Sequence, residues 1–270
     1  MKLQDVRLFD VETLSALGTL SSVEPSRFTY RTSEFNYECL LRPKVGAKRL
    51  FIIFHGAKVQ EKRPPPYFDR WSWAPEFPGS VLFVSDPSLQ VDKQLCLSWY
   101  IGNEREWPIA VIAKIASGIC EASGIAEGNV IGYGASGGGF AGLALASHMK
   151  TGGAIAINSQ TNVFQYHARH VREMLKYCFP TYSDREEVMA KFGERLNMVD
   201  RYDRDSNARV LAVQNTEDAF HHQHHYLPFV NAFSRSRCAV NLRTHLYEHE
   251  SGHGPEQREM LPLIWSLAFD

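Results

Sequence analysis

The sequence lacks an excess of charge of either sign. Its 29 lysines and arginines offset 30 aspartates and glutamates, and the formal net charge is −1. Nucleic-acid binding and adhesion to an anionic membrane usually depend on a basic surface, so this balance supports neither. No stretch approaches the ~20 apolar residues of a transmembrane helix, and charged residues interrupt the N-terminal segment where a signal peptide would need an apolar core. We therefore expect no nucleic-acid partner, no transmembrane segment and no signal peptide.

Cysteine is scarce as well. The five cysteines are scattered, odd in number and without a C-x-x-C pair: Cys39, Cys96, Cys120, Cys178 and Cys238. This pattern favours reduced thiols in a cytoplasmic protein over a disulfide framework. The 270 residues also contain no linker, internal repeat or low-complexity tract, and their apolar fraction of 44% is ordinary for a globular protein. We expect a single domain over residues 1–270.

Apolar segments alternate with helical ones along most of the chain. Continuous apolar runs indicate strands buried on both faces, at residues 49–54, 80–85, 130–133, 153–157 and 209–214. Helical spacing or composition indicates helices at residues 107–122, 140–149, 226–234 and 255–268, with a further strand at 239–247. This alternation predicts an α/β fold: a mainly parallel central sheet with helices on both faces.

Other segments depart from the alternation. Residues 1–26 are weakly patterned and predict a peripheral helix and loop, whereas residues 27–41 predict an antiparallel strand pair at one edge of the sheet. Residues 64–73 are rich in proline and aromatic side chains and predict a surface loop. Residues 161–205 are polar and mixed, and they follow a strand. They predict a helical cap insertion over the carboxyl edge of the sheet, within the single domain.

A G-x-S-x-G motif, centred on Ser136, follows a buried strand and precedes an apolar helix. A bare motif of this kind is often a glycine-rich turn with an incidental serine. The strand–turn–helix context is the one in which such a serine becomes a nucleophile, because the sharp turn presents its hydroxyl at the end of a central strand. The start of the following helix favours negative charge there. We therefore predict that Ser136 is a catalytic nucleophile.

A serine nucleophile needs a base, because its hydroxyl is a poor nucleophile near neutral pH. Asp218 follows the penultimate strand and His253 lies in a glycine-containing turn after the last one, which gives the chain order serine, acid, histidine. His253 would accept the serine proton, and Asp218 would fix its tautomer and stabilise the imidazolium. Glu217 could replace Asp218, and His249 could replace His253; we favour Asp218 and His253.

The backbone offers donors for an oxyanion. The N–H of Gly137, directly after the nucleophile, is one expected donor. The second should come from the turn after residues 49–54, where we favour Ala57 over Gly56. His55, in the same turn, is more easily explained as a structural residue than as a second base.

Four histidines cluster at residues 221–225. His221 and His225 would share a helical face and could bind a metal, but no third ligand at a defined spacing is visible. We predict no metal site. Because the cluster follows Asp218, one of its histidines is an alternative substrate contact.

With these motifs, the chain resembles the α/β-hydrolase superfamily from about residue 49 to its end. More narrowly, residues 97–102, the triple-glycine turn at Ser136 and residues 156–161 resemble proteins of bacterial surface-polysaccharide gene clusters. That group includes capsule sugar O-acetyltransferases, which use a serine triad to move acetyl from acetyl-CoA to a sugar hydroxyl. The resemblance implies that Trp99 and Tyr100 lie near the active site. It also implies acetyl-CoA as acyl donor and a saccharide as acceptor, although the chain has no phosphate-binding signature for CoA.

Further substrate contacts are expected at the carboxyl ends of the strands, where ligands bind to such sheets. Asn158 ends a strand there, and Arg169 and Arg172 could form a fork for an anionic group on the acceptor. The alternative is a solvated helix whose arginines pair with nearby acids. The sequence thus predicts serine acyl transfer without a tightly bound cofactor, with an esterase and a non-catalytic binding protein of the same fold as alternatives.

Overall fold

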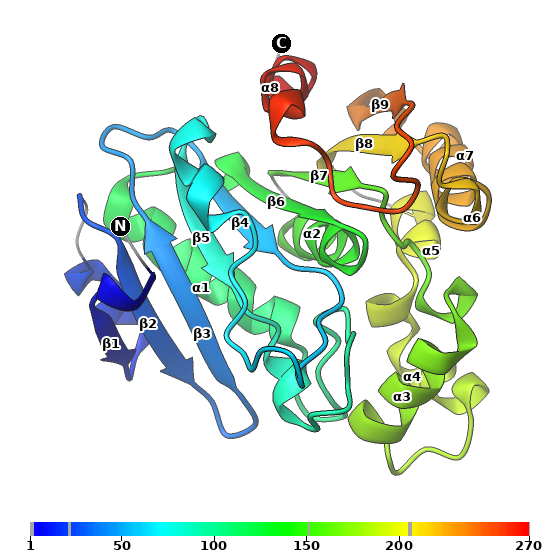
Figure 1. Ribbon diagram of the computed structural model, residues 1–270, viewed down its shortest axis with the longest axis horizontal. Helices are drawn as coiled ribbons and strands as arrows, with labels where there is room; N and C mark the ends of the chain where they lie inside the picture. The colour runs from blue at the N-terminus through cyan, green and yellow to red at the C-terminus, as the bar shows by residue number, and fades with distance from the viewer. Residues whose placement is uncertain (1–2, 21–22, 151, 205–206, 270) are drawn as a thin grey trace.

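The computed structural model describes residues 3–20, 23–150, 152–204 and 207–269. Within these residues nine strands form one sheet, in the spatial order β1-β2-β3-β5-β4-β6-β7-β8-β9 (Figure 1). Strand β3 is antiparallel to β2 and β5, and the other neighbouring pairs are parallel, so the predicted mainly parallel sheet is confirmed. The strands are β1 (Leu8–Val11), β2 (Ser26–Arg31), β3 (Asn36–Arg42), β4 (Leu50–Phe54), β5 (Ser80–Val84), β6 (Val130–Ala135), β7 (Gly153–Ile157), β8 (Arg209–Asn215) and β9 (Leu242–Tyr247).

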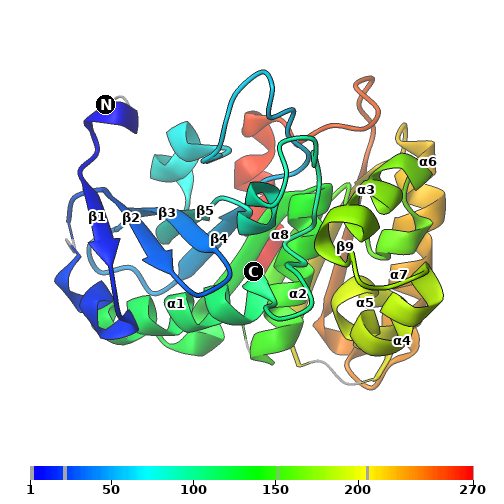
Figure 2. The same cartoon turned by 90° about the horizontal axis from the view of Figure 1, so that it is seen from below.

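Helices cover both faces of this sheet, as predicted. In Figure 1, α2 and α8 lie on opposite faces of β6 and β7, and Figure 2 shows α1 and α2 along the same face. The α-helices in the described part of the chain are α1 (Pro108–Ser123), α2 (Gly137–Met149), α3 (Ala168–Cys178), α4 (Arg185–Leu196), α5 (Met198–Arg204), α6 (Ala219–His221), α7 (Leu227–Arg235) and α8 (Leu261–Phe269). None of these described helices combines the length and the apolarity needed to cross a membrane.

The central strands are continuous apolar runs because each contributes to two cores. In β4, Leu50, Ile52 and Phe54 belong to the core shared with α1 and α2. Phe51 and Ile53 belong to the core beneath α8. Side chains alternate between the faces of a strand, so a strand buried on both sides is apolar at every position.

Some local predictions are wrong. The N-terminal segment contains strand β1, parallel to β2 at the edge of the sheet, where a helix and loop were predicted. Only Val11 of this strand is buried, so the strand carries little apolar signal. Tyr67 and Phe68, predicted in a surface loop, are buried. The last helix begins at Leu261 rather than at residue 255.

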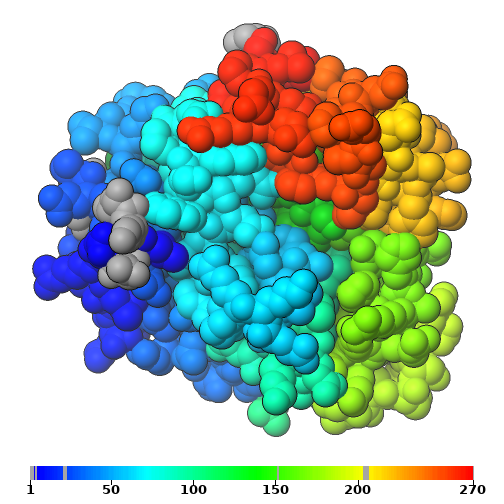
Figure 3. Space-filling model, in the orientation of Figure 1, coloured from blue at the N-terminus to red at the C-terminus, as the bar shows by residue number. Residues whose placement is uncertain are grey.

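The segment predicted as a cap is helical and contains α3, α4 and α5. Helix α5 packs against α2 and α7 and so joins the helical layer beside the sheet. On the face viewed in Figure 3, the yellow-green insertion borders a hollow, together with the cyan segment and the orange-red C-terminal segment. The insertion therefore flanks the carboxyl ends of the strands from one side.

Candidate active site

Ser136 occupies the sharp turn between β6 and α2. Its φ of 56° and ψ of −125° lie outside the regions that most L-residues adopt, so the backbone is strained here. A Cβ at Gly134 would lie 2.5 Å from the carbonyl carbon of Gly138, and one at Gly138 would lie 2.4 Å from the carbonyl oxygen of Phe54. Only glycine fits at both positions, which lets strand and helix approach closely on either side of the serine.

Ser136 lies within hydrogen-bond distance of His253, and His253 of Asp218. Ser136 Oγ is 3.1 Å from His253 Nε2, and His253 Nδ1 is 2.6 Å from Asp218 Oδ2. Because an ionised carboxylate only accepts hydrogen bonds, Nδ1 carries the ring proton and Nε2 is free to accept one from the serine. The geometry therefore suits proton transfer from Ser136 to His253.

Asp218 is held in its ionised form. Burial alone would raise the pKa of its carboxyl, but hydrogen bonds from His221 and His253 outweigh burial and hold the pKa well below its usual range. The alternatives are placed elsewhere: Glu217 is exposed, and Nδ1 of His249 lies 2.8 Å from Ser251 Oγ. Of the two acids and two histidines considered, the structure brings Asp218 and His253 to Ser136.

Gln160 also contacts the nucleophile, a role that the sequence did not predict. Its Nε2 donates to Ser136 Oγ at 2.8 Å and lies 2.7 Å from His221 Nε2. Its Oε1 accepts from the indole N–H of Trp99 at 3.2 Å. The available signal was a run of polar residues, 158–161, that directly follows a buried strand next to the nucleophile strand.

His221 is a second imidazole on the same carboxylate. Its Nδ1 lies 2.9 Å from Asp218 Oδ1, and its ring stacks on that of His253 with centroids 3.8 Å apart and planes 5° from parallel. Burial lowers the pKa of His221, so the neutral ring is favoured. Of the roles considered for the histidine cluster, a hydrogen-bonding role is the one that the structure shows for His221.

The turn after β4 lies beside the nucleophile. A Cβ at Gly56 would be 3.6 Å from Ser136 Cβ and 4.0 Å from the backbone nitrogen of Gly137. Within the described part of the chain, neither Gly137 N–H nor Ala57 N–H has a hydrogen-bond acceptor outside its own helix or strand. These amides therefore remain candidates for an oxyanion. His55 is buried and structural, because its Nε2 accepts from the N–H of Asp86 at 3.0 Å.

Two residues predicted as substrate contacts, Tyr100 and Asn158, are buried in this structure. The Tyr100 side chain is buried, and its hydroxyl donates to Val84 O at 2.8 Å and accepts from His55 N–H at 3.1 Å. Asn158 is also buried, and its Nδ2 donates to Tyr247 Oη and Gly254 O, both at 2.8 Å. Both residues support the turns around the site and have no surface for a ligand.

Trp99 lies close to the nucleophile but is buried as well. A Cβ at Gly137 would lie 3.5 Å from its Cδ1, and its ring packs edge-on against Tyr166 with centroids 5.8 Å apart. Its indole N–H binds Gln160. In this structure Trp99 orients Gln160 rather than offering a surface to substrate.

The segment that carries His253 is anchored on both sides. Before it, Asn215 Nδ2 donates to His249 O at 2.7 Å and to Gly252 O at 2.8 Å. After it, the buried Glu256 accepts two hydrogen bonds of 2.6 Å from Arg70 and one from the hydroxyl of Tyr133 in β6. Residue 256 is therefore engaged in an ion pair instead of starting the last helix.

A cleft of about 620 Å³ begins at Ala57 and runs between two loops and α3. Arg169 lines it, but Arg172 does not. Arg169 is largely exposed, and its Nε lies 2.8 Å from Glu173 Oε1. The two arginines therefore do not form the predicted fork. Arg169 instead pairs with a nearby acid, which was the alternative prediction. The complete lining is Ala57, Lys58, Val59, Gln60, Glu61, Lys93, Gln94, Cys96, Arg169, His170 and Glu173.

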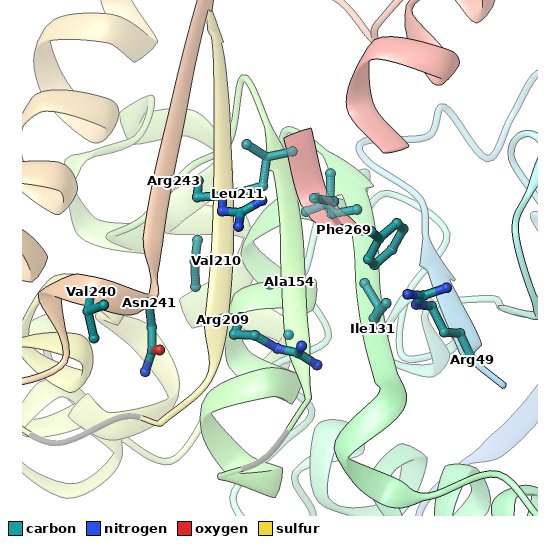
Figure 4. Close-up of a pocket in the computed structure, with 13 residues that line it drawn as sticks. Arg49, Ile131, Ala154, Arg209, Val210, Leu211, Val240, Asn241, Arg243 and Phe269 are labelled. Carbon is teal, nitrogen blue, oxygen red and sulfur yellow. The ribbon is translucent and has the colours of Figure 1, made fainter. Parts of the chain in front are cut away.

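A second, smaller pocket of about 190 Å³ lies at the other end of the parallel strands. Figure 4 shows Arg49, Arg209 and Arg243 around an apolar floor that includes Ile131 and Val210. These residues precede or begin their strands, whereas Ser136, Asp218 and His253 follow the carboxyl ends of theirs. This pocket is therefore separate from the site at Ser136.

His221 and His225 lie close together, with ring centroids 5.3 Å apart, but no third ligand groups with His225 in the described residues. His225 Nδ1 accepts from the N–H of Thr161 at 3.3 Å. In the described part of the chain, the group with ligand atoms within 4.8 Å of one another is instead Asp218, His221 and His253. Their atoms are engaged in the hydrogen bonds around Ser136, which explains why they lie so close together.

Comparisons with known proteins identify the fold. No family model matches the sequence, and no curated protein matches it. A histidine-to-alanine variant of the capsule O-acetyltransferase of Neisseria meningitidis serogroup A, in complex with CoA, matches with a TM-score of 0.62 at 14% identity, over 94% of this chain and 97% of that one. Acetyl xylan esterase from Paenibacillus sp. R4 matches with a TM-score of 0.57 at 12% identity, over 99% and 100% of the two chains.

A third match is MPT51 of Mycobacterium tuberculosis, with a TM-score of 0.56 at 13% identity over 86% of this chain and 94% of that one. At such identities the likeness concerns the fold. The chain has the α/β-hydrolase fold, as its sequence predicted, and it resembles the capsule O-acetyltransferase in structure. The neighbours include acyltransferase and esterase enzymes.

The buried His225 predicts a pH dependence of stability. Burial lowers the pKa of its imidazole to about 3, whereas an unfolded histidine titrates near ~6.5. As the pH falls below ~6.5, the unfolded chain binds a proton that the folded chain does not, so the free energy of unfolding falls by about 1.4 kcal/mol per pH unit until the folded pKa is reached. We expect His225→Asn, which keeps an acceptor for Thr161 N–H, to reduce this fall by about 2 kcal/mol between pH 6.5 and 4.5.

Urea unfolding at a series of pH values measures this effect. The exposed His224 supplies the matched control His224→Asn, which should leave the pH dependence unchanged. An unchanged pH dependence in His225→Asn would contradict the account of a neutral, buried imidazole.

Proposed function

We propose that this protein is a serine acyltransferase in which Ser136 is the nucleophile, His253 the general base and Asp218 the acid that orients it. The observation that carries the proposal is the continuous hydrogen-bonded path from Ser136 Oγ through His253 to Asp218, with distances of 3.1 and 2.6 Å. A serine, an imidazole and a buried carboxylate in this order are the groups that activate a hydroxyl for attack on an acyl carbon.

In the first half of the reaction, Ser136 Oγ transfers its proton to His253 Nε2 and bonds to the acyl carbon. The carbonyl electron pair moves to the oxygen, and the amides of Gly137 and Ala57, with Gly56 as the alternative to Ala57, donate to that oxyanion. The bond to the leaving group then breaks. The leaving group takes the proton from His253, and an acyl-enzyme on Ser136 remains.

In the second half, an acceptor hydroxyl gives its proton to His253 and bonds to the acyl carbon. The acyl carbon–Oγ bond breaks, its electron pair returns to Oγ, and His253 returns the proton to Ser136. The ionised Asp218 stabilises the imidazolium in both halves. This chemistry needs neither a metal nor a tightly bound cofactor.

The donor that we favour is acetyl-CoA, as a substrate, and the acceptor that we favour is a hydroxyl of a surface polysaccharide or its precursor. Support comes from the sequence resemblance of residues 97–102, the Ser136 turn and residues 156–161, and from the fold shared with a capsule O-acetyltransferase solved with CoA. The cytoplasm is the corresponding location, and Cys39, Cys96, Cys120 and Cys178 are free thiols. The fold shared with an acetyl xylan esterase supports the alternative, hydrolysis of a small or sugar ester.

The cleft at Ala57 suits a hydroxyl-rich acceptor. Its volume of about 620 Å³ lies within the usual ~300–1,000 Å³ of small-molecule sites. Buried atoms of two of its lining residues, His170 Nδ1 and Glu173 Oε2, lie 3.7 Å from each other, and neither has a hydrogen bond in the described residues. Buried polar atoms without a hydrogen bond are costly, and sugar hydroxyls would supply the missing hydrogen bonds. We propose that the insertion at residues 161–205 belongs to a single domain of residues 1–270 and forms one wall of this acceptor site.

The assignment of the triad predicts unequal effects of neighbouring substitutions. Ser136→Ala should abolish turnover of p-nitrophenyl acetate and acetyl transfer from acetyl-CoA to a sugar acceptor. Asp218→Asn should reduce both by up to about 10⁴-fold, because it favours the wrong tautomer of His253. The matched control Glu217→Gln should retain activity, because Glu217 is exposed. Retention of either activity in a folded Ser136→Ala protein would contradict the proposal.

The cleft predicts that Arg169 affects the acceptor alone. Arg169→Ala should raise the acceptor KM by about 10-fold, as for one lost charged hydrogen bond, with p-nitrophenyl acetate hydrolysis unchanged. Arg172→Ala is the matched control, since Arg172 lies on the same helix but outside the cleft lining. Equal effects of the two substitutions, or of Arg169→Ala on both substrates, would leave Arg169 without this role.

A further inference from the structure

We propose that Gln160 is a further catalytic residue and that His221 positions it, so that a second hydrogen-bonded arm connects Asp218 to Ser136. This inference rests on the proposed serine chemistry and adds two residues to it. In the triad alone, Ser136 Oγ donates a hydrogen bond to His253. With the second arm, the same oxygen also accepts a hydrogen bond from Gln160.

The second arm closes a ring of side chains. His221 Nδ1 donates to Asp218 Oδ1 at 2.9 Å, and His221 Nε2 accepts from Gln160 Nε2 at 2.7 Å. Gln160 Nε2 uses its other proton to donate to Ser136 Oγ at 2.8 Å. The triad returns from Ser136 through His253 to the other carboxylate oxygen of Asp218.

The direction of each hydrogen bond in the ring is fixed by its neighbours. An indole N–H can only donate, so Trp99 requires Gln160 Oε1 to face it and Gln160 Nε2 to face Ser136. Asp218 can only accept, so both histidines carry their protons on Nδ1. His221 Nε2 is then an acceptor, as the amide of Gln160 requires. The hydroxyl proton of Ser136 is left with one acceptor in the ring, His253 Nε2.

The amide of Gln160 acts on the oxygen that leaves the acyl-enzyme. In the free enzyme the serine oxygen already accepts this hydrogen bond. The attack of Ser136 on the acyl carbon therefore gains only part of the stabilisation that the bond provides. In the acyl-enzyme Oγ is an ester oxygen, which is a weaker acceptor. When the acyl carbon–Oγ bond breaks, Oγ gains negative charge and the hydrogen bond strengthens. Interactions that are stronger in the transition state than in the ground state raise the rate, so Gln160 should contribute most to deacylation.

His221 holds this arm in place. Its ring lies parallel to His253 at 3.8 Å, and the two imidazoles occupy one oxygen each of the same carboxylate. The His221 and Gln160 side chains are buried, so water has little access to replace their contacts. Loss of the His221–Gln160 contact would free the amide to turn away from Ser136.

Acetyl-enzyme kinetics test this role. With p-nitrophenyl acetate, the burst gives the acylation rate and the decay of the acetyl-enzyme gives the deacylation rate. Gln160→Met, which keeps the length of the side chain but removes both N–H donors, should slow deacylation by about 10–100-fold. The burst should keep its full amplitude, and acylation should slow less. His221→Asn, which keeps a donor near Asp218 but does not reach Gln160, should slow deacylation in the same direction.

The control is Gln165→Met, an exposed glutamine in the same segment, which should leave both rates unchanged. Equal rates of deacylation in Gln160→Met and the unsubstituted protein would overturn the inference, as would equal slowing of acylation and deacylation. Turnover in folded Ser136→Ala, or acetylation of a residue other than Ser136, would instead overturn the proposed function, so the two failures are distinguishable. Circular dichroism and thermal unfolding of each variant establish that the burst reports on folded protein.

Discussion

The close packing of β6 against α2 is the constraint on which the site depends. A Cβ at Gly132 would lie 2.7 Å from Cα of Gly142, so strand and helix approach to a distance that excludes any side chain between them. The same packing holds Ser136 at a positive φ of 56° at the end of the strand. A residue held in such a conformation costs of order 1–3 kcal/mol, and it persists only where its surroundings determine it. Here the surroundings are the two cores on either side of the sheet.

The position of His253, across the site from Ser136, depends on contacts between residues far apart in the sequence. Asn158 and Asn215 at the ends of β7 and β8 bind the backbone on either side of His253, and Arg70 binds Glu256 in a buried ion pair. Removal of one partner of a buried ion pair leaves an uncompensated charge, typically at a cost of 3–5 kcal/mol. The position of His253 is thus tied to the same strands that position Ser136 and Asp218.

The parts of this structure that could be predicted from sequence are those with local signals. β4 to β8 carry apolar runs because both of their faces are buried, and the Ser136 turn carries glycines because no other residue fits. Strand β1 could not be recognised, since only Val11 of its residues is buried. The direction of a side chain at the end of a strand is not a local property either. Tyr100 and Asn158 therefore looked like ligand contacts, although both point into the protein.

The contact between Gln160 and His221 could not be predicted for a related reason. They are 61 residues apart, and their contact exists only because β7 and β8 are neighbours and α6 turns back toward Ser136. A histidine three residues after an acid is a common sequence pattern, and the role of such a histidine depends on the residues that pack against its ring. The order serine, acid, histidine could be predicted from the sequence. The second set of hydrogen bonds, from Asp218 through His221 and Gln160 to Ser136, could not.

The most direct test of the account is the site at which the protein becomes acetylated. Protein incubated with acetyl-CoA or p-nitrophenyl acetate, quenched in acid and digested, should carry one acetyl group on Ser136, and the modification should disappear when a saccharide acceptor is added. Acetylation of another residue, or turnover in which Ser136 is never acetylated, would contradict it.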